Sequence, residues 1–358
     1  MKKSQVWVAF LVVLFLLAAL VACSPKETTE GTAEEGAAEE GTAEEAVEET
    51  IELRLVMPTP AGDERTVWNE EMAESFNARA GGRYVLKVHP GGTLVNVTEY
   101  LDAVRTGAVE MFDSALPTYA GQEPRFNAFV LPYLFDSGEA FAAAEADLVE
   151  LFSAITEEKF NQKILGFVYV GSFDIFNTKR TIKSPEDLKG MLVGAPDPGI
   201  AAILDQLGAA TVNVAWPDFY TSLDKGVVDG IMFMPNAVIN NKLTDLCKYY
   251  TSINNPQGHA ALSINLDVWN AMPEDIQQIL VEEIQKSYQK VSEHYINQRE
   301  KDHETMRGLG VEVYLPTEAE QEQFKALCID YTEQELDNYG DVGAKLREIR
   351  EKANNQVR

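Results

Sequence analysis

Short stretches of alternating apolar and polar residues are separated along this chain by stretches in which apolar residues recur every three or four positions. The first spacing is typical of half-buried strands and the second of amphipathic helices. Between residues 51 and 113 the two spacings take turns, with glycine and proline at the breaks. They predict strands over 51–56, 84–89 and 109–113, and helices over 66–77 and 97–106. This rhythm is typical of α/β layers around a mostly parallel sheet.

The same rhythm resumes near Gly166. Residues 184–187 read Ser-Pro-Glu-Asp, which predicts a helix start: a serine N-cap, proline at the first helical position and acids near the positive end of the dipole. Further strands are predicted over 167–170, 192–193, 211–214 and 228–232, and further helices over 200–207 and 219–225. About 300 residues of this kind suit two lobes better than one core.

The longest predicted helix begins at Met272 and ends near Arg307, before two glycines. Its apolar residues are three or four positions apart throughout. At about 1.5 Å per residue it is about 50 Å long, so we expect it to cross both lobes. A coiled coil with a partner helix is the alternative.

The first residues have the organisation of an export signal. Two lysines precede an apolar run over 6–20, which is shorter than the about 20 residues that a membrane-spanning helix needs. The string Leu20-Val21-Ala22-Cys23 then resembles the bacterial lipobox, in which the cysteine is lipidated and becomes the mature N-terminus. We therefore expect a lipoprotein signal peptide over 1–22 and lipidation of Cys23. An ordinary signal peptide, or an uncleaved anchor, is the alternative.

Residues 23–50 are rich in glutamate, alanine and glycine and contain no aromatic residue. Such a segment cannot bury enough apolar surface to fold, and its like charges keep it extended, so we expect a disordered acidic tether. Eleven glutamates and one lysine within 24–52 supply part of the net charge of −27. Because phosphate binding relies on clustered Lys and Arg, this charge argues against a nucleic-acid partner.

Motifs for catalysis or cofactor binding are missing from the sequence. The chain has four histidines, none at a zinc-site spacing with a third ligand nearby: His89, His259, His294 and His303. It contains no glycine-rich dinucleotide or phosphate loop and no nucleophile elbow. We therefore expect no enzyme, no metal and no cofactor. Cys247 and Cys328 are either a disulfide or two isolated buried thiols.

An ordered series of short motifs, most of them within 165–251, carries a resemblance to a known family. The motifs are Asn177-Thr-Lys-Arg-Thr-Ile-Lys-Ser-Pro-Glu-Asp-Leu-Lys-Gly190, Trp216-Pro-Asp-Phe-Tyr220, Gly226-Val-Val-Asp-Gly230 and, upstream, Pro90-Gly-Gly-Thr-Leu94 and Leu131-Pro-Tyr-Leu-Phe135. In order and spacing they resemble the solute receptors of tripartite ATP-independent periplasmic (TRAP) transporters, the DctP family. The likeness covers nearly all of 51–310.

The resemblance implies an α/β, two-lobed periplasmic-binding-protein fold (type II-like) with a long helix crossing both lobes. We expect lobe I over 51–171 plus about 260–300, and lobe II over 172–259 plus about 301–358. The implied function is capture of a small polar organic solute by lobe closure. Delivery to membrane permease subunits follows, outside the cytoplasm, with the lipid on Cys23 as the membrane anchor. A ligand-sensing receptor for a membrane signalling partner is the alternative.

The expected ligand depends on two missing arginines. Members of the family usually hold a carboxylate with arginines, because the planar guanidinium suits bidentate pairing. In this sequence Gly194 and Asp174 stand at the expected positions. Either another cation enters the cleft (Arg105, Arg125 or Lys242), or the ligand is not a simple organic acid. In the second case an unpaired Asp174 favours a polyol, a sugar-like molecule or an amine.

The other candidate contacts are aromatic residues near the cleft and residues at strand ends, where open α/β sheets bind ligands. The aromatic candidates, which also suit the core, are Phe173, Trp216, Tyr220 and Phe233. The strand-end candidates are Thr59, Thr93, Ser114, Met234 and Asn236, and His259 lies in the return crossing between the lobes.

Overall fold

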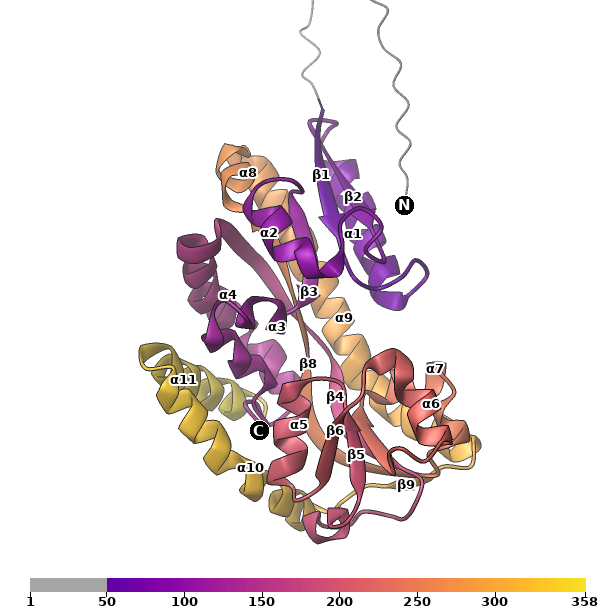
Figure 1. Cartoon of the computed structure of the whole chain (residues 1–358). Helices are drawn as coiled ribbons and strands as arrows, with labels where there is room; N and C mark the ends of the chain where they lie inside the picture. Colours follow the sequence, from indigo (N-terminus) through magenta and orange to yellow (C-terminus); the bar gives the residue numbers. More distant parts are fainter. Residues whose placement is uncertain (1–49) are drawn as a thin grey trace, which may run out of the picture. The chain divides into compact units, whose positions relative to one another are not determined.

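The computed structural model describes residues 50–358, except for the side chains of residues 256 and 257. They belong to one compact unit, Glu48–Arg358. The strands are β1 (Ile51–Val56), β2 (Tyr84–His89), β3 (Met111–Ala115), β4 (Gln162–Asn177), β5 (Leu192–Ala195), β6 (Ala210–Asn213), β7 (Gly230–Phe233), β8 (Tyr249–Asn265) and β9 (Glu312–Tyr314). The helices are α1 (Glu64–Arg79), α2 (Tyr100–Arg105), α3 (Pro117–Ala120), α4 (Gly138–Phe160), α5 (Pro198–Gln206), α6 (Phe219–Asp224), α7 (Pro235–Asn240), α8 (Leu266–Ala271), α9 (Glu274–Gly308), α10 (Glu318–Asn338) and α11 (Asp341–Gln356) (Figure 1).

Within the described part of the chain, one mixed sheet has the order β2-β1-β3-β8-β4-β7-β5-β6, with β9 beside β8. The pairs at its two ends are parallel: β1 with β2 and β3, and β5 with β6 and β7. The pairs in the middle, β3 with β8, β8 with β4 and β4 with β7, are antiparallel. The predicted mostly parallel sheet is therefore correct at the ends and wrong in the middle, because β4 and β8 run through both ends and pair with each other.

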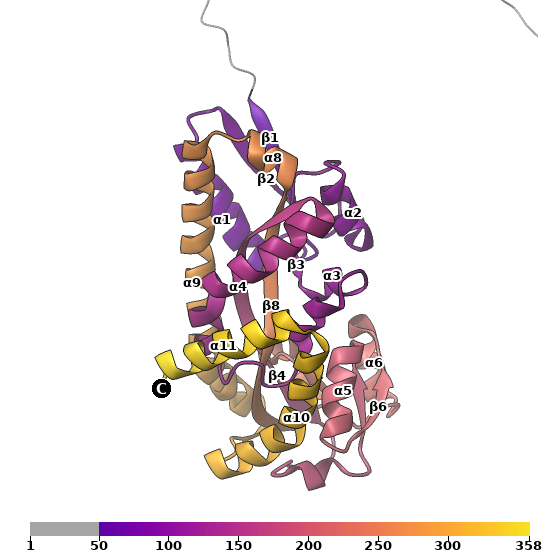
Figure 2. The same ribbon diagram turned by 90° about the vertical axis from the view of Figure 1, so that its left-hand side faces the viewer.

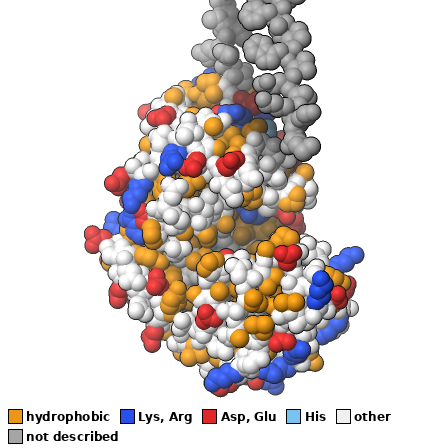
Figure 3. Space-filling view, viewed as in Figure 1, with side chains coloured by type: hydrophobic (Ala, Val, Ile, Leu, Met, Phe, Trp, Pro, Cys, Tyr) orange, Lys and Arg blue, Asp and Glu red, His pale blue; other side chains and the backbone are white. Residues whose placement is uncertain are grey.

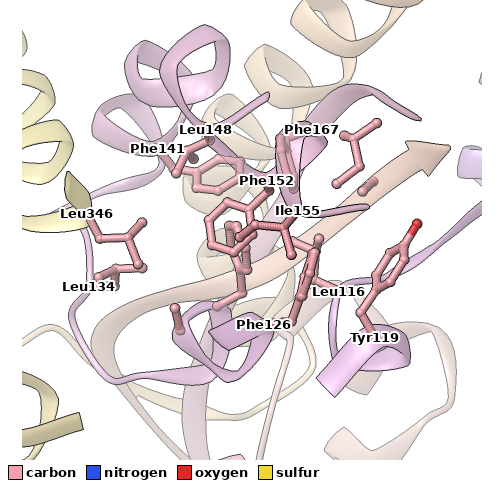
Figure 4. Close-up of a cluster of buried hydrophobic side chains, with 14 of the residues drawn as sticks. Leu116, Tyr119, Phe126, Leu134, Phe141, Leu148, Phe152, Ile155, Phe167 and Leu346 are labelled. Atoms are coloured by element: carbon pink, nitrogen blue, oxygen red, sulfur yellow. The ribbon is translucent and has the colours of Figure 1, made fainter. Parts of the chain in front are cut away.

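The end of the sheet with β1, β2 and β3 forms a first lobe, which has helices on both faces. The first half of α9 and α1 cover one face, and their apolar cluster includes Leu55, Phe76 and Leu280. The other face is covered by α4 and the segment before it, with an aromatic cluster that includes Phe126 and Phe152 (Figure 4). Burying apolar surface on both faces stabilises this part of the sheet by about 25 cal/mol per Å² removed from water.

The other end of the sheet forms a second lobe with two smaller clusters. One joins α5 to α10 and includes Ile203 and Phe324. The other joins α6, α7 and the end of α9, and includes Phe219 and Met306. Each lobe thus has its own core on each face of the sheet, which is the two-layered packing that the alternating strands and helices predict.

The helix α9 is 35 residues long and contributes to clusters in both lobes. In Figure 1 it runs along the sheet from α8 and β1 to the region of α7 and β9, and Figure 2 shows it beside α1. The predicted long helix that crosses both lobes is confirmed.

The C-terminal helices also bridge the lobes. Phe324 of α10 packs with α5, whereas Leu336, Val342 and Leu346 belong to the cluster of α4 in the first lobe. Figure 2 shows α11 passing across α4. The lobe boundaries given above stay predictions, and this packing places the end of the chain against the first lobe.

The two crossing strands meet closely where they pass between the lobes. Gly171 of β4 faces Gly258 of β8, and register shifts flank Gly171 on both sides. A Cβ on Gly258 would lie 2.5 Å from the Gly171 carbonyl oxygen, so this contact requires glycine. Gly171 itself has a φ of 119°, which few residues with a side chain adopt.

The predicted signal peptide, the lipidated Cys23 and nearly all of the acidic tether lie outside the described residues. Among residues 50–358, no helix is both long and apolar enough to cross a bilayer. Cys247 and Cys328 are buried free thiols, in agreement with the second of the two alternatives for these residues.

Candidate functional site

A cavity of about 180 Å³, called the central cavity here, lies between the lobes. Residues at or just after the carboxyl ends of β3, β5 and β7 line it, namely Ala115, Asp197 and Met234. Open α/β sheets bind ligands at this edge. Figure 3 shows the face hollowed between the part with α1 and the part with α6 and α7. Much of the wall is apolar: Leu116, Phe129, Val130, Val170, Phe173 and Met234.

On the side of the first lobe, the central cavity is bounded by Arg65 in the first turn of α1. The guanidinium pairs with the buried Asp113 of β3. Asn69 Nδ2 (2.8 Å) and the hydroxyl of Tyr288 (3.2 Å) donate to the other carboxylate oxygen of Asp113. Burial by itself lowers the pKa of Arg65, but the charge of Asp113 raises it on balance, so the arginine stays charged.

On the side of the second lobe, the cavity is bounded by Asp197, the N-cap residue of α5. Its Oδ1 accepts a hydrogen bond from the backbone N–H of Ile200 at 3.0 Å. Pro198 follows at the first helical position, so the local sequence fixes this helix start in two ways. The positive end of α5 is therefore occupied by a carboxylate of the chain itself.

A second cavity of about 140 Å³ lies on the other side of β4 and is called the α9-side cavity here. Its wall includes Gly171, Ser172, Asn254 and Arg299. The register shifts around Gly171 explain why residues 171 and 172 face this cavity while Val170 and Phe173 face the central one.

Beside the α9-side cavity lies Asp174, which is fully buried. Its carboxylate accepts hydrogen bonds from the Tyr250 hydroxyl (2.7 Å) and the Asn254 N–H (3.0 Å), and Arg299 Nη2 lies 3.9 Å away. Arg299 also donates to the side chains of Asn254 and Ser252. Asp174 is thus not unpaired, because β8 and α9 supply its partners. The interpretation that an unpaired Asp174 favours a polyol or an amine as the solute was therefore wrong.

Three of the residues singled out in the sequence come together around the central cavity: Phe173, Met234 and His259. They come from β4, the residue after β7, and β8. The His259 ring stacks on Phe141 with 4.0 Å between centroids. Behind Phe173, the rings of Phe233 and Trp216 continue an aromatic row, with Trp216 stacked on Phe233 at 4.2 Å.

The remaining candidates lie elsewhere in the described structure, and the cavity wall does not include them. Thr59 bonds Thr66, the exposed Thr93 bonds the Pro90 carbonyl, and Ser114 bonds Thr118. Gly194 lies in β5 against Val214 and Ile231. Tyr220 is 46% exposed, and Asn236 lines the α9-side cavity.

The cations considered from the sequence do not line the central cavity either. Arg105 pairs with Asp102, Arg125 pairs with Glu123, and Lys242 precedes a short 3₁₀ turn. Arg65 and Asp197 were missed. One signal for Arg65 is present in the sequence: an arginine in the first turn of a helix opposes the helix dipole, so another interaction must hold it there.

Comparison with known proteins identifies the family of this chain. The model of the family described as bacterial extracellular solute-binding protein, family 7 (DctP), matches residues 59–336. The chain belongs to this family. As a DctP-family member it is a solute receptor of the TRAP type that acts outside the cytoplasm.

The relatives are distant in sequence. The 2,3-diketo-L-gulonate-binding periplasmic protein YiaO of Escherichia coli is 25% identical over 263 residues, which cover 73% of this chain and 80% of that protein. The C4-dicarboxylate-binding periplasmic protein DctP of Rhodobacter capsulatus is 26% identical over 211 residues, 58% of this chain and 62% of that protein.

Solved structures share the fold. A TRAP periplasmic solute-binding protein of Chromohalobacter salexigens with bound D-glucuronate superposes with a TM-score of 0.73 at 18% identity, covering 84% of this chain and 99% of that one. DctP7 of Bordetella pertussis, a receptor binding pyroglutamic acid, superposes with a TM-score of 0.72 at 17% identity, with the same coverage. The predicted two-lobed TRAP receptor fold is confirmed.

Proposed function

We propose that the central cavity is the solute site of this DctP-family receptor and that Arg65 binds a carboxylate of the solute there. The observation that carries the proposal is the position of Arg65: it places a largely buried guanidinium at the strand-end edge, where the two expected arginines are missing. A desolvated guanidinium offers charge-assisted hydrogen bonds, which are about twice as strong as neutral ones.

The arrangement of the walls supports capture by closure. Arg65 belongs to the first lobe and Asp197 to the second, while the glycine contact between β4 and β8 lies between the lobes. A solute that touches both walls makes its full set of contacts only when the lobes are together. It therefore favours the closed state by its differential affinity for that state.

Permease subunits of a TRAP transporter are the partners that we infer from membership of the family. The receptor releases its solute to them, and it does not transform the solute chemically. The comparisons lend no support to the alternative of a sensing receptor for a signalling partner.

The test of the solute site is to purify the full chain in mild detergent and identify the small molecule that remains bound, by mass spectrometry after denaturation. We expect a carboxylic acid near one equivalent per chain. A bound molecule without an acidic group would contradict the role of Arg65.

We also propose that Cys23 is lipidated and holds the receptor on the membrane, as the lipobox-like string suggests. Two or more acyl chains anchor a protein stably, whereas one does so only marginally. Growth with an alkyne fatty acid should label the wild-type chain and a Cys247→Ser control, but not Cys23→Ser. Labelling of Cys23→Ser would exclude this site of lipidation.

A further inference from the structure

The two charged walls of the central cavity are unequal in a way that bears on the solute. Arg65 already has a carboxylate partner in Asp113, so the pair brings no net positive charge to the cavity. Asp197 has no cationic partner among the described residues. The cavity therefore presents one uncompensated carboxylate.

The second oxygen of Asp197 has room for a donor. Its Oδ1 caps α5, and no residue that the structure describes donates to Oδ2. Asp197 is half-buried, so water reaches this oxygen while the cavity is empty. Closing the lobes over a solute removes that water, which is costly unless the solute supplies a hydrogen-bond donor. A donor on the solute would satisfy it, and an ammonium group would also balance its charge.

A simple monocarboxylate fits this cavity poorly. It would bring a second negative charge into a space that Asp197 already makes negative, and like charges in a partly dry site repel more strongly than in water. The helix dipole of α5 does not relieve this repulsion, because Asp197 itself caps that helix end.

We propose that the central cavity binds a small carboxylic acid that also carries a basic amine, with the carboxylate on Arg65 and the ammonium on Asp197. This inference rests on the proposed function and names the class of its solute. Asp197 is the residue that determines specificity. The apolar wall between the two, with Leu116, Phe129, Val170 and Phe173, suits a hydrocarbon body better than a row of hydroxyls.

The test uses amino acids and their deaminated counterparts as matched probes. The full chain, stripped of bound molecules by reversible unfolding, is titrated calorimetrically with α-, β- and γ-amino acids of three to six carbons, proline included. Each is compared with the acid of the same skeleton in which hydrogen, hydroxyl or oxo replaces the amine. At least one amino acid should bind at least tenfold more tightly than its three counterparts.

Two variants make the test specific. Asp197→Asn removes the charge and keeps the cap, because asparagine caps helices as well as aspartate does. This variant should bind the amino acid at least tenfold more weakly than the wild type does. It should bind the deaminated counterpart as tightly as the wild type does, or more tightly. The control is Asp205→Asn, on the same helix but bonded to Thr211 away from the cavity, and it should change neither.

The outcomes separate this inference from the proposed function. Binding of only the deaminated acids, equal binding of both kinds, or no binding by any amino acid overturns the amine assignment. If the amine assignment fails but Arg65→Met abolishes binding of a deaminated acid, the central cavity is still the solute site. If Arg65→Met leaves all binding unchanged, both proposals fail.

Discussion

Two buried arginine–carboxylate pairs lie on opposite sides of β4, and their surroundings differ. Arg299 has Asp174 nearby and donates to two further side chains, so its donors serve the chain itself. Arg65 has one carboxylate partner, Asp113, and faces the central cavity. The bonds that Arg299 donates within the chain tie it to its own surroundings, whereas Arg65 makes fewer such bonds and has more of its five N–H donors to offer a solute.

The comparison also explains why Asp174 was a misleading sign of an unusual solute. Its position in the sequence, where an arginine is expected, suggested a charge in the cleft. In the fold it lies on the other side of β4, where Tyr250, Asn254 and Arg299 surround it. The acidic group that does line the central cavity is Asp197.

The largest effect expected from this difference is on stability. Asp174→Ala should lower the free energy of unfolding by about 3–5 kcal/mol, because it leaves Arg299 and Tyr250 buried without their carboxylate. Arg65→Met should cost less, since Asp113 keeps its bonds from Asn69 and Tyr288. Urea unfolding of both variants measures this order. The reverse order would show that Arg65, and not Arg299, is the structural arginine.

A smaller effect is expected at the contact between the crossing strands. Gly258→Ala places a Cβ against the Gly171 carbonyl, and such overpacking costs about 1–3 kcal/mol. Because this contact lies between the two arginine pairs, we expect solute affinity to fall as well. The control is Gly121→Ala, because no atom lies within 4 Å of the new Cβ. Gly190→Ala is unsuitable because Gly190 has a φ of 78°, which strains any residue with a side chain. Unchanged stability of Gly258→Ala would contradict the tight crossing.

The effect that is smallest at neutral pH is a pH dependence on the side of Arg299. Burial, and then the charge of Arg299, lowers the pKa of His303 to about 4. The unfolded chain then binds this proton more readily than the folded one, with an unperturbed pKa of about 6.5. Stability from this group is complete above about pH 6.5 and falls toward pH 4, by at most about 1.4 kcal/mol per pH unit.

His303→Gln checks this pH dependence, since glutamine can still bond the Tyr250 hydroxyl, which lies 3.1 Å from His303 Nε2. Its melting temperature should fall less between pH 7 and pH 4.5 than that of the wild type. His294→Gln, on the same helix but more exposed, serves as the control and should behave like the wild type. Equal slopes for His303→Gln and the wild type would refute the role of His303.

Local spacing predicted much of the fold. The strands β1 and β2 have the predicted bounds, and the long helix α9 begins and ends within two residues of its prediction. The predicted helix start at Ser184 is a single 3₁₀ turn, Pro185–Leu188, with a full capping box. The length of β4 and β8 was not foreseen, because buried polar residues such as Asn255 and Ser263 interrupt their apolar pattern. The helices α4, α10 and α11 were not predicted either.

The site was predictable only in part. Of the residues singled out in the sequence, the strand-end candidate Met234, the aromatic candidate Phe173 and His259 of the return crossing line the central cavity. Arg65 and Asp197 lie 132 positions apart in the numbering, on helices of different lobes, and only the fold brings them to one cavity. No local sequence pattern predicts that these two side chains lie at the same cavity.

The most direct test of the central claim is the affinity of the co-purified solute for Arg65→Met. Calorimetry should show binding about 30-fold weaker than for the wild type, which corresponds to about 2 kcal/mol for charge-assisted hydrogen bonds. Arg105→Met, which removes an exposed arginine paired with Asp102, should bind like the wild type. If Arg65→Met binds the solute as tightly as Arg105→Met does, the central cavity is not the solute site.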